Sequence, residues 1–321
     1  MRKLIILLLF ISFSCSNNDN GLEEEIEDCS GKYNTAGVLV NINQNIFNSD
    51  ESVNTNSRYS WSSNGLERIL NGNGIPNHEV GTFPNNHNPN SIREQTINKR
   101  FTLCPNIISE SGLELVGPAL VIAYALNSVK FDPGTAGRCN DQGVCSLAQG
   151  QGNWNIEALG HDTFNFGDDM NHAHVQPNGA YHYHGIPELL VDFLGDSEGM
   201  TLVGWASDGF PVYARYGFLD PNDSSTKTVA LKPSYRLKSQ PDPNRPMVLT
   251  RLSGGPGQGT TPNTPIAMGA FTQDYEYVDG LGDLDQCNGR FGVTPEFPEG
   301  IYYYVVSDDF PFFTRCLKGN I

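Results

Sequence analysis

The sequence is short of positive charge. Its 321 residues contain 20 Lys and Arg against 36 Asp and Glu, a formal net charge of −16 at pH 7. Phosphate backbones and anionic lipid surfaces repel a chain this acidic, which argues against binding to nucleic acid or to a membrane surface through charge. Cations are therefore the expected charged partners.

Long apolar runs and several common motifs are also missing. The apolar stretch 4–11 near the N-terminus is too short to cross a bilayer. No C-x-x-C occurs, which argues against a zinc ribbon or a thioredoxin-like centre. G-x-S-x-G and H-E-x-x-H are absent as well, so no serine-hydrolase or zinc-protease motif is present.

The N-terminus has the pattern of an export signal. Two basic residues precede the apolar stretch 4–11, and small residues then lead to Cys15. We predict a lipoprotein signal peptide over 1–15, with Cys15 as the lipidated residue, although ordinary secretion stays open. The acidic, polar segment 16–28 is predicted to be a flexible tether, and 29–321 the folded domain. The expected location is the outer membrane, facing the periplasm or the cell exterior, or the secreted fraction.

Six cysteines remain in the predicted mature chain. An even number in an exported protein suggests three disulfides, which allows fifteen pairings. Proximity in sequence favours one disulfide between positions 139 and 145 and another between positions 287 and 316. The two remaining cysteines, at positions 29 and 104, would then pair with each other. The expected pairs are Cys29 with Cys104, Cys139 with Cys145, and Cys287 with Cys316.

Strand signals outnumber helix signals along the chain. The stretches 113–126, 200–218 and 300–307 are rich in β-branched and aromatic residues. One short helix is predicted over 186–194, with Pro187 in its first turn. Residues 33–100 are Asn-rich with weak periodicity, so we predict loops there and a possible short helix at 66–70. We expect 239–265 to be a surface excursion. The predicted fold is mainly β: a single large disulfide-stabilised β-sandwich or distorted barrel with long loops and few short helices.

Four of the seven histidines form two His-x-His pairs around a Pro-Asn-Gly turn. Successive strand residues point to opposite faces, so each pair presents both rings on one face. A two- or four-residue loop would put the two pairs on opposite faces. A three-residue loop at 177–179, which suits Pro-Asn-Gly, would place His174 opposite His182 and His172 opposite His184.

Four imidazoles on one face would form a ready nitrogen site. Neutral imidazole is the commonest metal ligand in proteins and suits copper and zinc. The alternative is a satisfied core in which the rings alternate with tyrosines, but four buried rings carry a large desolvation cost without a partner. We predict a copper or zinc site. The histidines that could add ligands are His78, His87 and His161; the predicted ligand set is His78, His172, His174, His182 and His184.

Two further residues are candidates for acid–base chemistry. Asp208 ends a strong predicted strand and precedes a Gly-Phe-Pro turn. Its carboxylate could serve as a metal ligand, as a hydrogen-bond partner of a histidine, or as a plain turn cap. If the metal site is catalytic, Asp208 or His161 is the predicted general acid or base.

The chain resembles the YHYH domain family of exported bacterial proteins, named for the stretch found here at 181–184. The resemblance extends over 73–85, 205–217 and 282–304 and so covers nearly all of the predicted mature chain. It departs from the family in the long segment 239–265 and at Ala214, where glycine is expected. The resemblance places five of the candidate residues in family motifs: His78, His172, His182, His184 and Asp208.

Three functions follow as hypotheses. The first is an exported metal-binding protein that holds copper or zinc in its histidine cluster. The second is a metal-dependent extracytoplasmic enzyme, a hydrolase, in which three histidines leave one coordination position open to water. The third is a structural or adhesive surface module with incidental histidines. The expected partners are a metal ion and, only through the N-terminal lipid, a membrane.

Overall fold

A computed structural model describes residues 29, 32–108, 113–114, 121–195, 198–254 and 263–321. The predicted signal peptide with Cys15 and the predicted tether 16–28 lie outside the described residues. Within the part that is described, none of the helices has the length and apolar character that crossing a bilayer requires.

An eight-stranded mixed sheet forms the centre of the molecule. Its neighbours pair antiparallel, except β12 with β7 and β14 with β23, which are parallel. In spatial order the strands are β11 (Ala173–Val175), β12 (Tyr181–Tyr183), β7 (Lys130–Phe131), β6 (Ala123–Ala125), β13 (Thr201–Ala206), β14 (Pro211–Ala214), β23 (Ile301–Val306) and β22 (Gly289–Gly292).

Both faces of this sheet are buried. In β23, Tyr302 and Tyr304 belong to one apolar cluster, whereas Tyr303 and Val305 on the opposite face belong to a second. Strands covered on both faces contain nearly continuous apolar runs rather than alternating ones. The strand predictions within 113–126, 200–218 and 300–307 are accordingly confirmed in their described parts.

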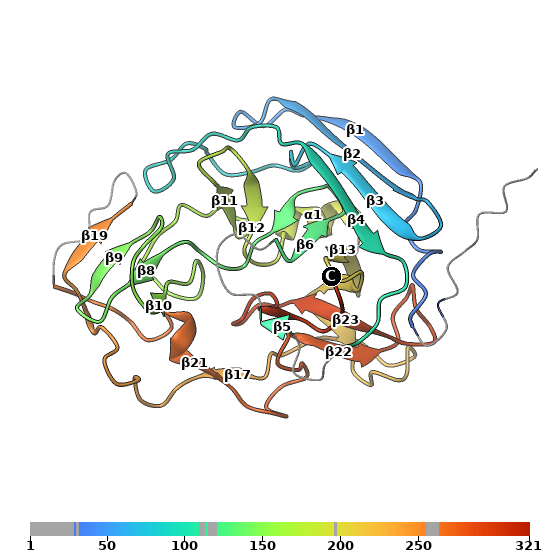
Figure 1. Cartoon of the computed structure of the whole chain (residues 1–321). Helices are drawn as coiled ribbons and strands as arrows, with labels where there is room; N and C mark the ends of the chain where they lie inside the picture. The colour runs from blue at the N-terminus through green and yellow to red at the C-terminus, as the bar shows by residue number, and fades with distance from the viewer. Residues whose placement is uncertain (1–28, 30–31, 109–112, 115–120, 196–197, 255–262) are drawn as a thin grey trace, which may run out of the picture.

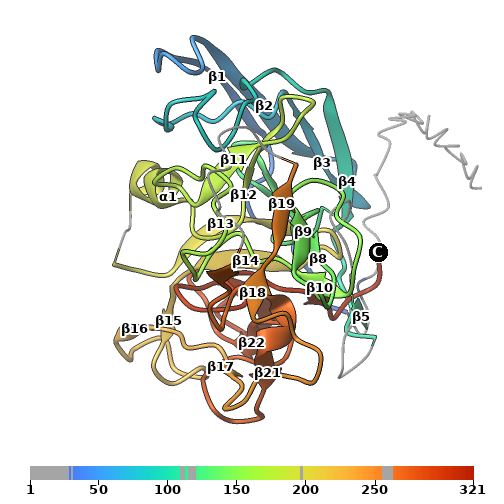
Figure 2. The ribbon, with the colours of Figure 1, turned by 90° about the vertical axis from the view of Figure 1, so that its left-hand side faces the viewer.

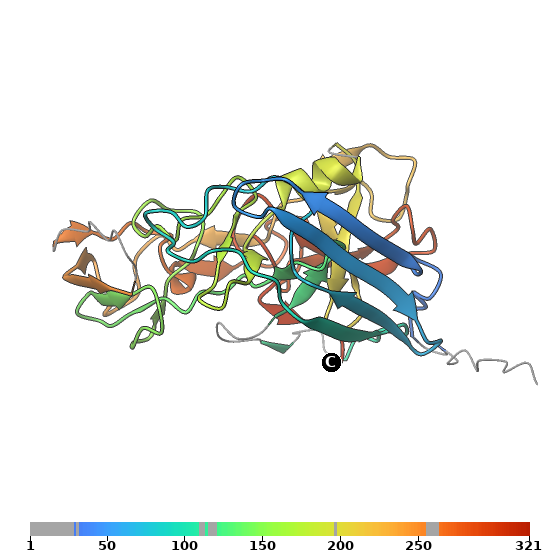
Figure 3. The ribbon, with the colours of Figure 1, turned by 90° about the horizontal axis from the view of Figure 1, so that it is seen from above.

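A four-stranded antiparallel sheet packs on the second face. Trp61, Leu70 and Phe101 from this sheet share an apolar cluster with Trp205 and Tyr303 of the central sheet. Figures 1 and 3 show it lying across one end of the molecule. Its strands are β1 (Ile42–Asn48), β2 (Thr55–Ser63), β3 (Glu67–Gly72) and β4 (Ile97–Thr102).

This sheet corrects the prediction of a loop-rich segment at 33–100, and β3 replaces the possible helix at 66–70. Buried and more exposed residues alternate along β2 and β3, but some of the buried positions that face the central sheet are polar. Ser57 and Arg68 are both buried there. The Arg68 guanidinium lies 3.5 Å from the centre of the Trp205 ring and donates to the carbonyl of Thr35 at 2.8 Å. Polar residues with such partners hide the apolar alternation that marks a half-buried strand.

A smaller sheet lies at the opposite end of the molecule and faces the viewer in Figure 2. It lies over a third apolar cluster that includes Trp154 and Phe271. Residues 239–265, predicted to be a surface excursion, contribute β19 to this sheet and a separate short pair. The small sheet contains β10 (Trp154–Asn155), β8 (Arg138–Cys139), β9 (Val144–Ser146) and β19 (Arg251–Ser253).

The remaining regular structure is short. The two-stranded pairs are β15 (Tyr216–Phe218) with β16 (Thr228–Ala230), β17 (Tyr235–Leu237) with β21 (Tyr275–Tyr277), β18 (Val248–Leu249) with β20 (Thr264–Pro265), and β24 (Cys316–Leu317) with β5 (Leu113–Glu114). The predicted helix is present as α1 (Glu188–Leu194), with Pro187 one position before its first residue, and η1 (Thr272–Asp274) is a single 3₁₀ turn.

The fold is thus mainly β, as predicted. Sheets stack on each other as in a sandwich, and none of the described sheets closes into a barrel. The three expected disulfides are present: Cys29–Cys104, Cys139–Cys145 and Cys287–Cys316.

Candidate metal centre

Strands β11 and β12 form the predicted hairpin. His174 pairs with His182, and the backbone N–H of Gln176 donates to the carbonyl of Ala180 at 2.9 Å, which leaves the three-residue loop 177–179. Gly179 has a φ of +89°, the left-handed conformation that ends such a loop. The prediction that a three-residue loop places His174 opposite His182 is therefore correct.

A row of paired residues runs across five strands from this hairpin. His174 lies opposite His182, His182 beside Lys130, Lys130 opposite Tyr124, and Tyr124 opposite Trp205. Paired residues of adjacent strands point to the same face of a sheet. The histidines therefore share the face that β1–β4 cover further along, and they occupy its edge beyond that cover.

Three imidazoles meet at this edge through the same ring atom. The Nε2 atom of His184 lies 3.2 Å from that of His174 and 3.0 Å from that of His182. The three residues form a group whose ligand atoms all lie within 4.8 Å of one another. Nitrogens bound to zinc at about 2.0–2.1 Å in a tetrahedron lie about 3.3 Å apart. The observed spacing is close to that required by one shared metal ion.

The other ring nitrogens of the buried pair point at backbone carbonyls. The Nδ1 atom of His182 lies 3.2 Å from the carbonyl oxygen of Ala180, and that of His184 lies 3.5 Å from the carbonyl oxygen of Pro133. A carbonyl only accepts, so Nδ1 must carry the proton and Nε2 the lone pair. The backbone thus selects the tautomer in which Nε2 can ligate a metal.

A carboxylate fixes the tautomer of the third ring, that of His174. The Nδ1 atom of His174 lies 2.6 Å from Oδ1 of Asp168, and both side chains are largely buried. Burial alone would raise the pKa of Asp168, but its charge interaction and hydrogen bond with His174 lower the pKa overall. Carboxylate–histidine–metal chains of this kind orient the ring and increase its basicity as a ligand.

Burial keeps the central histidines neutral. The pKa of His184 is lowered to about 3 and that of His182 falls well below its usual value, in both cases mainly because burial disfavours the charged ring and next because of His174. His182 and His184 therefore present neutral rings with lone pairs on Nε2, and the Nε2 atom of His174 converges on the same point. Such a group could hold a cation without a proton first leaving His182 or His184 at neutral pH.

A polar network flanks the cluster. The Lys130 ammonium donates to Oδ2 of Asp132 at 3.1 Å and to Oε1 of Gln176 at 2.8 Å. The amide of Gln176 also donates to Oδ2 of Asp132 at 2.9 Å. Oδ1 of Asp132 is buried and has no hydrogen-bond partner among the described residues, and burial raises the pKa of this carboxyl. The network neutralises Lys130 beside the histidines.

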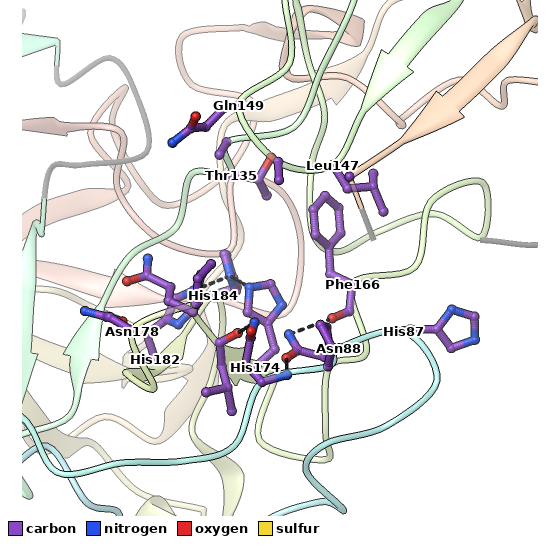
Figure 4. A pocket seen from close by; sticks show the side chains of 18 of the residues that line it. His87, Asn88, Thr135, Leu147, Gln149, Phe166, His174, Asn178, His182 and His184 are labelled. Carbon is purple, nitrogen blue, oxygen red and sulfur yellow. Dashed lines mark hydrogen bonds between the residues drawn. The ribbon is translucent and has the colours of Figure 1, made fainter. Parts of the chain in front are cut away.

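The histidines open into a cavity of about 550 Å³. Figure 4 shows His174, His182 and His184 gathered on one side, with Thr135 and Gln149 on the far side. The cavity walls come from three separate stretches, 87–90, 134–136 and 147–149, besides the hairpin, Phe166 and Gly254. Three protein ligands beside a cavity leave room for a fourth ligand that the protein does not supply.

Two predicted ligands lie outside this group. His172 precedes the first residue of β11 and has a φ of +52°, which turns its ring away; its Nδ1 donates to the carbonyl of Ile186 at 2.9 Å. His78 lies on the other face of the hairpin, where its Nε2 is 2.6 Å from the Tyr183 hydroxyl and its Nδ1 is 2.8 Å from the carbonyl of Glu79. The structure therefore brings together three of the five.

Asp208 lies in the turn between β13 and β14, and none of its hydrogen bonds reaches a histidine. Its buried carboxylate accepts from the Tyr304 hydroxyl at 2.7 Å and from the backbone N–H groups of Gly319 and Phe210 at 2.9 and 3.3 Å. Burial raises its pKa despite these donors. The turn-cap alternative describes it best, because it joins its own turn to the C-terminal segment.

The remaining two histidines do not join the cluster either. Both ring nitrogens of His161 are occupied: Nε2 lies 2.8 Å from the carbonyl of Glu157, and Nδ1 accepts from the N–H groups of Thr163 and Phe164. His87 is exposed, at the rim of the cavity.

Sequence reasoning missed the residues that support the cluster. Asp168 comes six positions before His174, in the acidic pair at 168–169, and this short spacing was the only available signal. Lys130 and Asp132 lie some fifty positions away in sequence. Only the parallel pairing of β7 with β12 reveals that they adjoin the histidines.

Comparisons with other proteins identify one family. Searches of curated proteins and of solved structures give no match. The YHYH protein family matches residues 100–319, a stretch that includes the hairpin, the three clustered histidines and most of the cavity wall. The stretch 73–85, which we included in the resemblance, lies before the matched region. Since the match spans more than half of its length, the chain belongs to the YHYH protein family.

Proposed function

We propose that the protein is an exported metal-binding protein in which His174, His182 and His184 hold a transition metal ion. The convergence of three Nε2 atoms, at 3.0 and 3.2 Å from one another, is the observation that supports this function. Rings that served only the core would turn their lone pairs towards donors rather than towards each other. The outward partners of the Nδ1 atoms favour the same conclusion.

The chemistry of the ligands favours zinc or copper. Imidazole nitrogens suit both metals, whereas calcium and magnesium prefer oxygen ligands. The group contains three imidazole rings and no thiolate or carboxylate, so a bound ion would retain most of its charge. Asp168, bonded to His174, supplies one negative charge next to the ion.

The disulfides indicate an extracytoplasmic protein, because such bonds persist in oxidising compartments. We further propose that Cys15 carries the lipid that anchors the protein to the outer membrane, with 16–28 as the tether. The basic and apolar N-terminal pattern supports this anchor. Radiolabelled palmitate incorporation that is lost in Cys15→Ser would test it.

The metal site is tested by elemental analysis of the purified mature protein. We expect about one zinc or copper per chain, lost in the His182→Ala/His184→Ala double variant and retained in His87→Ala. His87 is a matched control because it is an exposed imidazole at the rim of the same cavity. Protein that contains no metal and takes up none from added zinc or copper would contradict the proposal.

A second candidate function is a metal-dependent hydrolase. The cavity of about 550 Å³ beside three protein ligands favours it, because catalytic zinc sites keep one coordination position open whereas structural sites are closed. A bound metal would lower the pKa of a water in that position. Asp208 and His161, predicted as acid or base, have their polar atoms committed elsewhere. The described residues that line the cavity include no carboxylate, so no general base is assigned.

Metal handling and catalysis differ in a simple experiment. A handling protein would bind the metal stoichiometrically and release it to a chelator without turning over ester or amide substrates. A hydrolase would turn over such substrates, and the His182→Ala/His184→Ala double variant would lose this activity together with the metal. Turnover that persists in the metal-free double variant would contradict a metal-dependent hydrolase.

A further inference from the structure

The cavity beside the three histidines has walls without formal charge. The nineteen described residues that line it include no Lys, Arg, Asp or Glu. In a chain with 56 charged side chains this composition is distinctive, since Lys+Arg 20 and Asp+Glu 36 are otherwise spread over the sequence.

Several polar groups of the walls are already used by the protein. The amide of Asn88 donates to the carbonyl of Phe166 at 3.2 Å, and that of Asn90 donates to the carbonyl of Val175 at 2.8 Å. The hydroxyl of Thr135 donates to the backbone as well. These side chains build the wall and offer little hydrogen bonding to a ligand, so the cavity presents mostly apolar surface.

Apolar side chains stand close to the proposed metal position. The ring of Phe166 stacks on the ring of His174, with centroids 5.7 Å apart and planes 27° apart. Leu147 lies next to Phe166 in Figure 4, towards the far wall. A ligand bound to the metal would therefore extend along an aromatic ring and an aliphatic side chain.

The walls offer no counter-charge to a ligand group that lies away from the metal. Lys130, the cation beside His182, is bound to Asp132 and Gln176 and does not line the cavity. Asp168 lies behind His174, and the whole chain carries −16. Phosphate and carboxylate groups that lie away from the metal are bound best by Arg and Lys, which the described walls lack. A cationic ligand would in turn be repelled by the metal ion itself.

We infer that the cavity binds a molecule that holds the metal through an oxygen or nitrogen group and extends an uncharged, largely apolar remainder along the walls. Esters, amides, ketones and phenols with apolar substituents belong to this class, whereas nucleotides and sugar acids, which carry charged or strongly polar groups away from the metal, do not. The volume of about 550 Å³ lies within the range of small-molecule sites. The inference rests on the proposed metal site and adds the class of molecule that the site accepts.

The test uses the cobalt-loaded protein and three probes that share one metal-binding group. They are benzohydroxamic acid, its 4-carboxylate, and acetohydroxamic acid, which lacks the ring. Binding is followed by the change in the visible absorption of Co²⁺. We expect benzohydroxamic acid to bind about tenfold or more tightly than either of the others, since its ring meets apolar walls and carries no charge.

A lysine introduced into the cavity wall tests whether the probes bind there, and a lysine introduced outside the cavity is its matched control. Gln149 is exposed and lines the far side of the cavity, so Gln149→Lys adds a cation there without changing a metal ligand. This variant should raise the affinity for the carboxylated probe about five- to tenfold and leave the Co²⁺ spectrum unchanged. Gln142→Lys, at another exposed position that does not line the cavity, should change neither the affinity nor the spectrum.

The outcomes separate the two proposals. If wild-type protein gives no tetrahedral Co²⁺ spectrum, the metal site itself is refuted. If the spectrum is present but the carboxylated probe binds as tightly as benzohydroxamic acid, the neutral cavity is refuted while the metal site stands. Equal effects of Gln149→Lys and Gln142→Lys would also refute the cavity as the binding site for the probes.

Discussion

Replacing Asp168 with Asn should weaken metal binding without removing a ligand. Asp168 accepts the Nδ1 proton of His174 at 2.6 Å, and its side chain is 16% exposed. Asn keeps an acceptor oxygen of similar shape but loses the charge. The hydrogen bond to His174 then changes from a charge-assisted bond to a neutral one of roughly half the strength.

The expected magnitude follows from the position of Asp168. Outer partners of metal-bound histidines are worth about 10–100-fold in metal affinity, equivalent to about 1.4–2.7 kcal/mol. Because Asp168 supports one of three rings, we expect the Kd for zinc to rise by this factor and not by the larger factor that follows loss of His174 itself. The free energy of unfolding of the metal-free protein should change by only about 1 kcal/mol.

The assay is a competition titration of zinc against a chromophoric chelator. Asp162→Asn is the matched control, since it removes the same charge from an exposed position on the preceding loop. It should leave the Kd for zinc within about twofold, because the interaction of exposed charges is screened by salt. A Kd for Asp168→Asn equal to that of Asp162→Asn would refute the reasoning, because His174 would then not depend on its carboxylate or would not bind the metal.

Three further predictions follow from buried groups. The pKa of His184 is about 3 in the folded protein and about 6.5 in the unfolded chain, so the unfolded chain takes up the proton first as the pH falls. The free energy of unfolding of the metal-free protein, measured with urea, should therefore be full above pH 6.5 and decrease towards lower pH. Removing the Cys29–Cys104 bond, which spans a sequence separation of 75, should cost about 4 kcal/mol by loop entropy, checked by unfolding of the double Ala variant. Asp274→Ala leaves the buried Arg245 guanidinium without its carboxylate and should lower the free energy of unfolding by about 3–5 kcal/mol; a loss below 1 kcal/mol would contradict the burial of this pair.

The parts of the fold that the sequence predicts are those determined by neighbours in the chain. The three-residue loop fixes which residues of the hairpin lie opposite each other, and this register pairs His174 with His182. The apolar runs at 200–218 and 300–307 stand out because both faces of the central sheet are buried. Two of the three disulfides close short stretches and were accessible to the same local reasoning.

The parts that the sequence does not predict depend on distant contacts. The strands of β1–β4 are hidden because Ser57 and Arg68 occupy inward positions that a pattern search expects to be apolar. His172 leaves the predicted face because its backbone is left-handed, a conformation that no residue type nearby signals. The cavity walls combine segments that only the assembled sheets bring together.

The ligands and the walls of the site also differ in how early they can form. All three ligands lie within one hairpin, between positions 174 and 184, whereas β19 must pair with β9 across more than a hundred residues. Local contacts cost little loop entropy and form before distant ones. A metal ion present during export is therefore expected to bind the hairpin while the rest of the chain is still unfolded, and so to act as a nucleus that speeds folding. In this order of assembly the ion would bind first, and the walls of the cavity would form around it last.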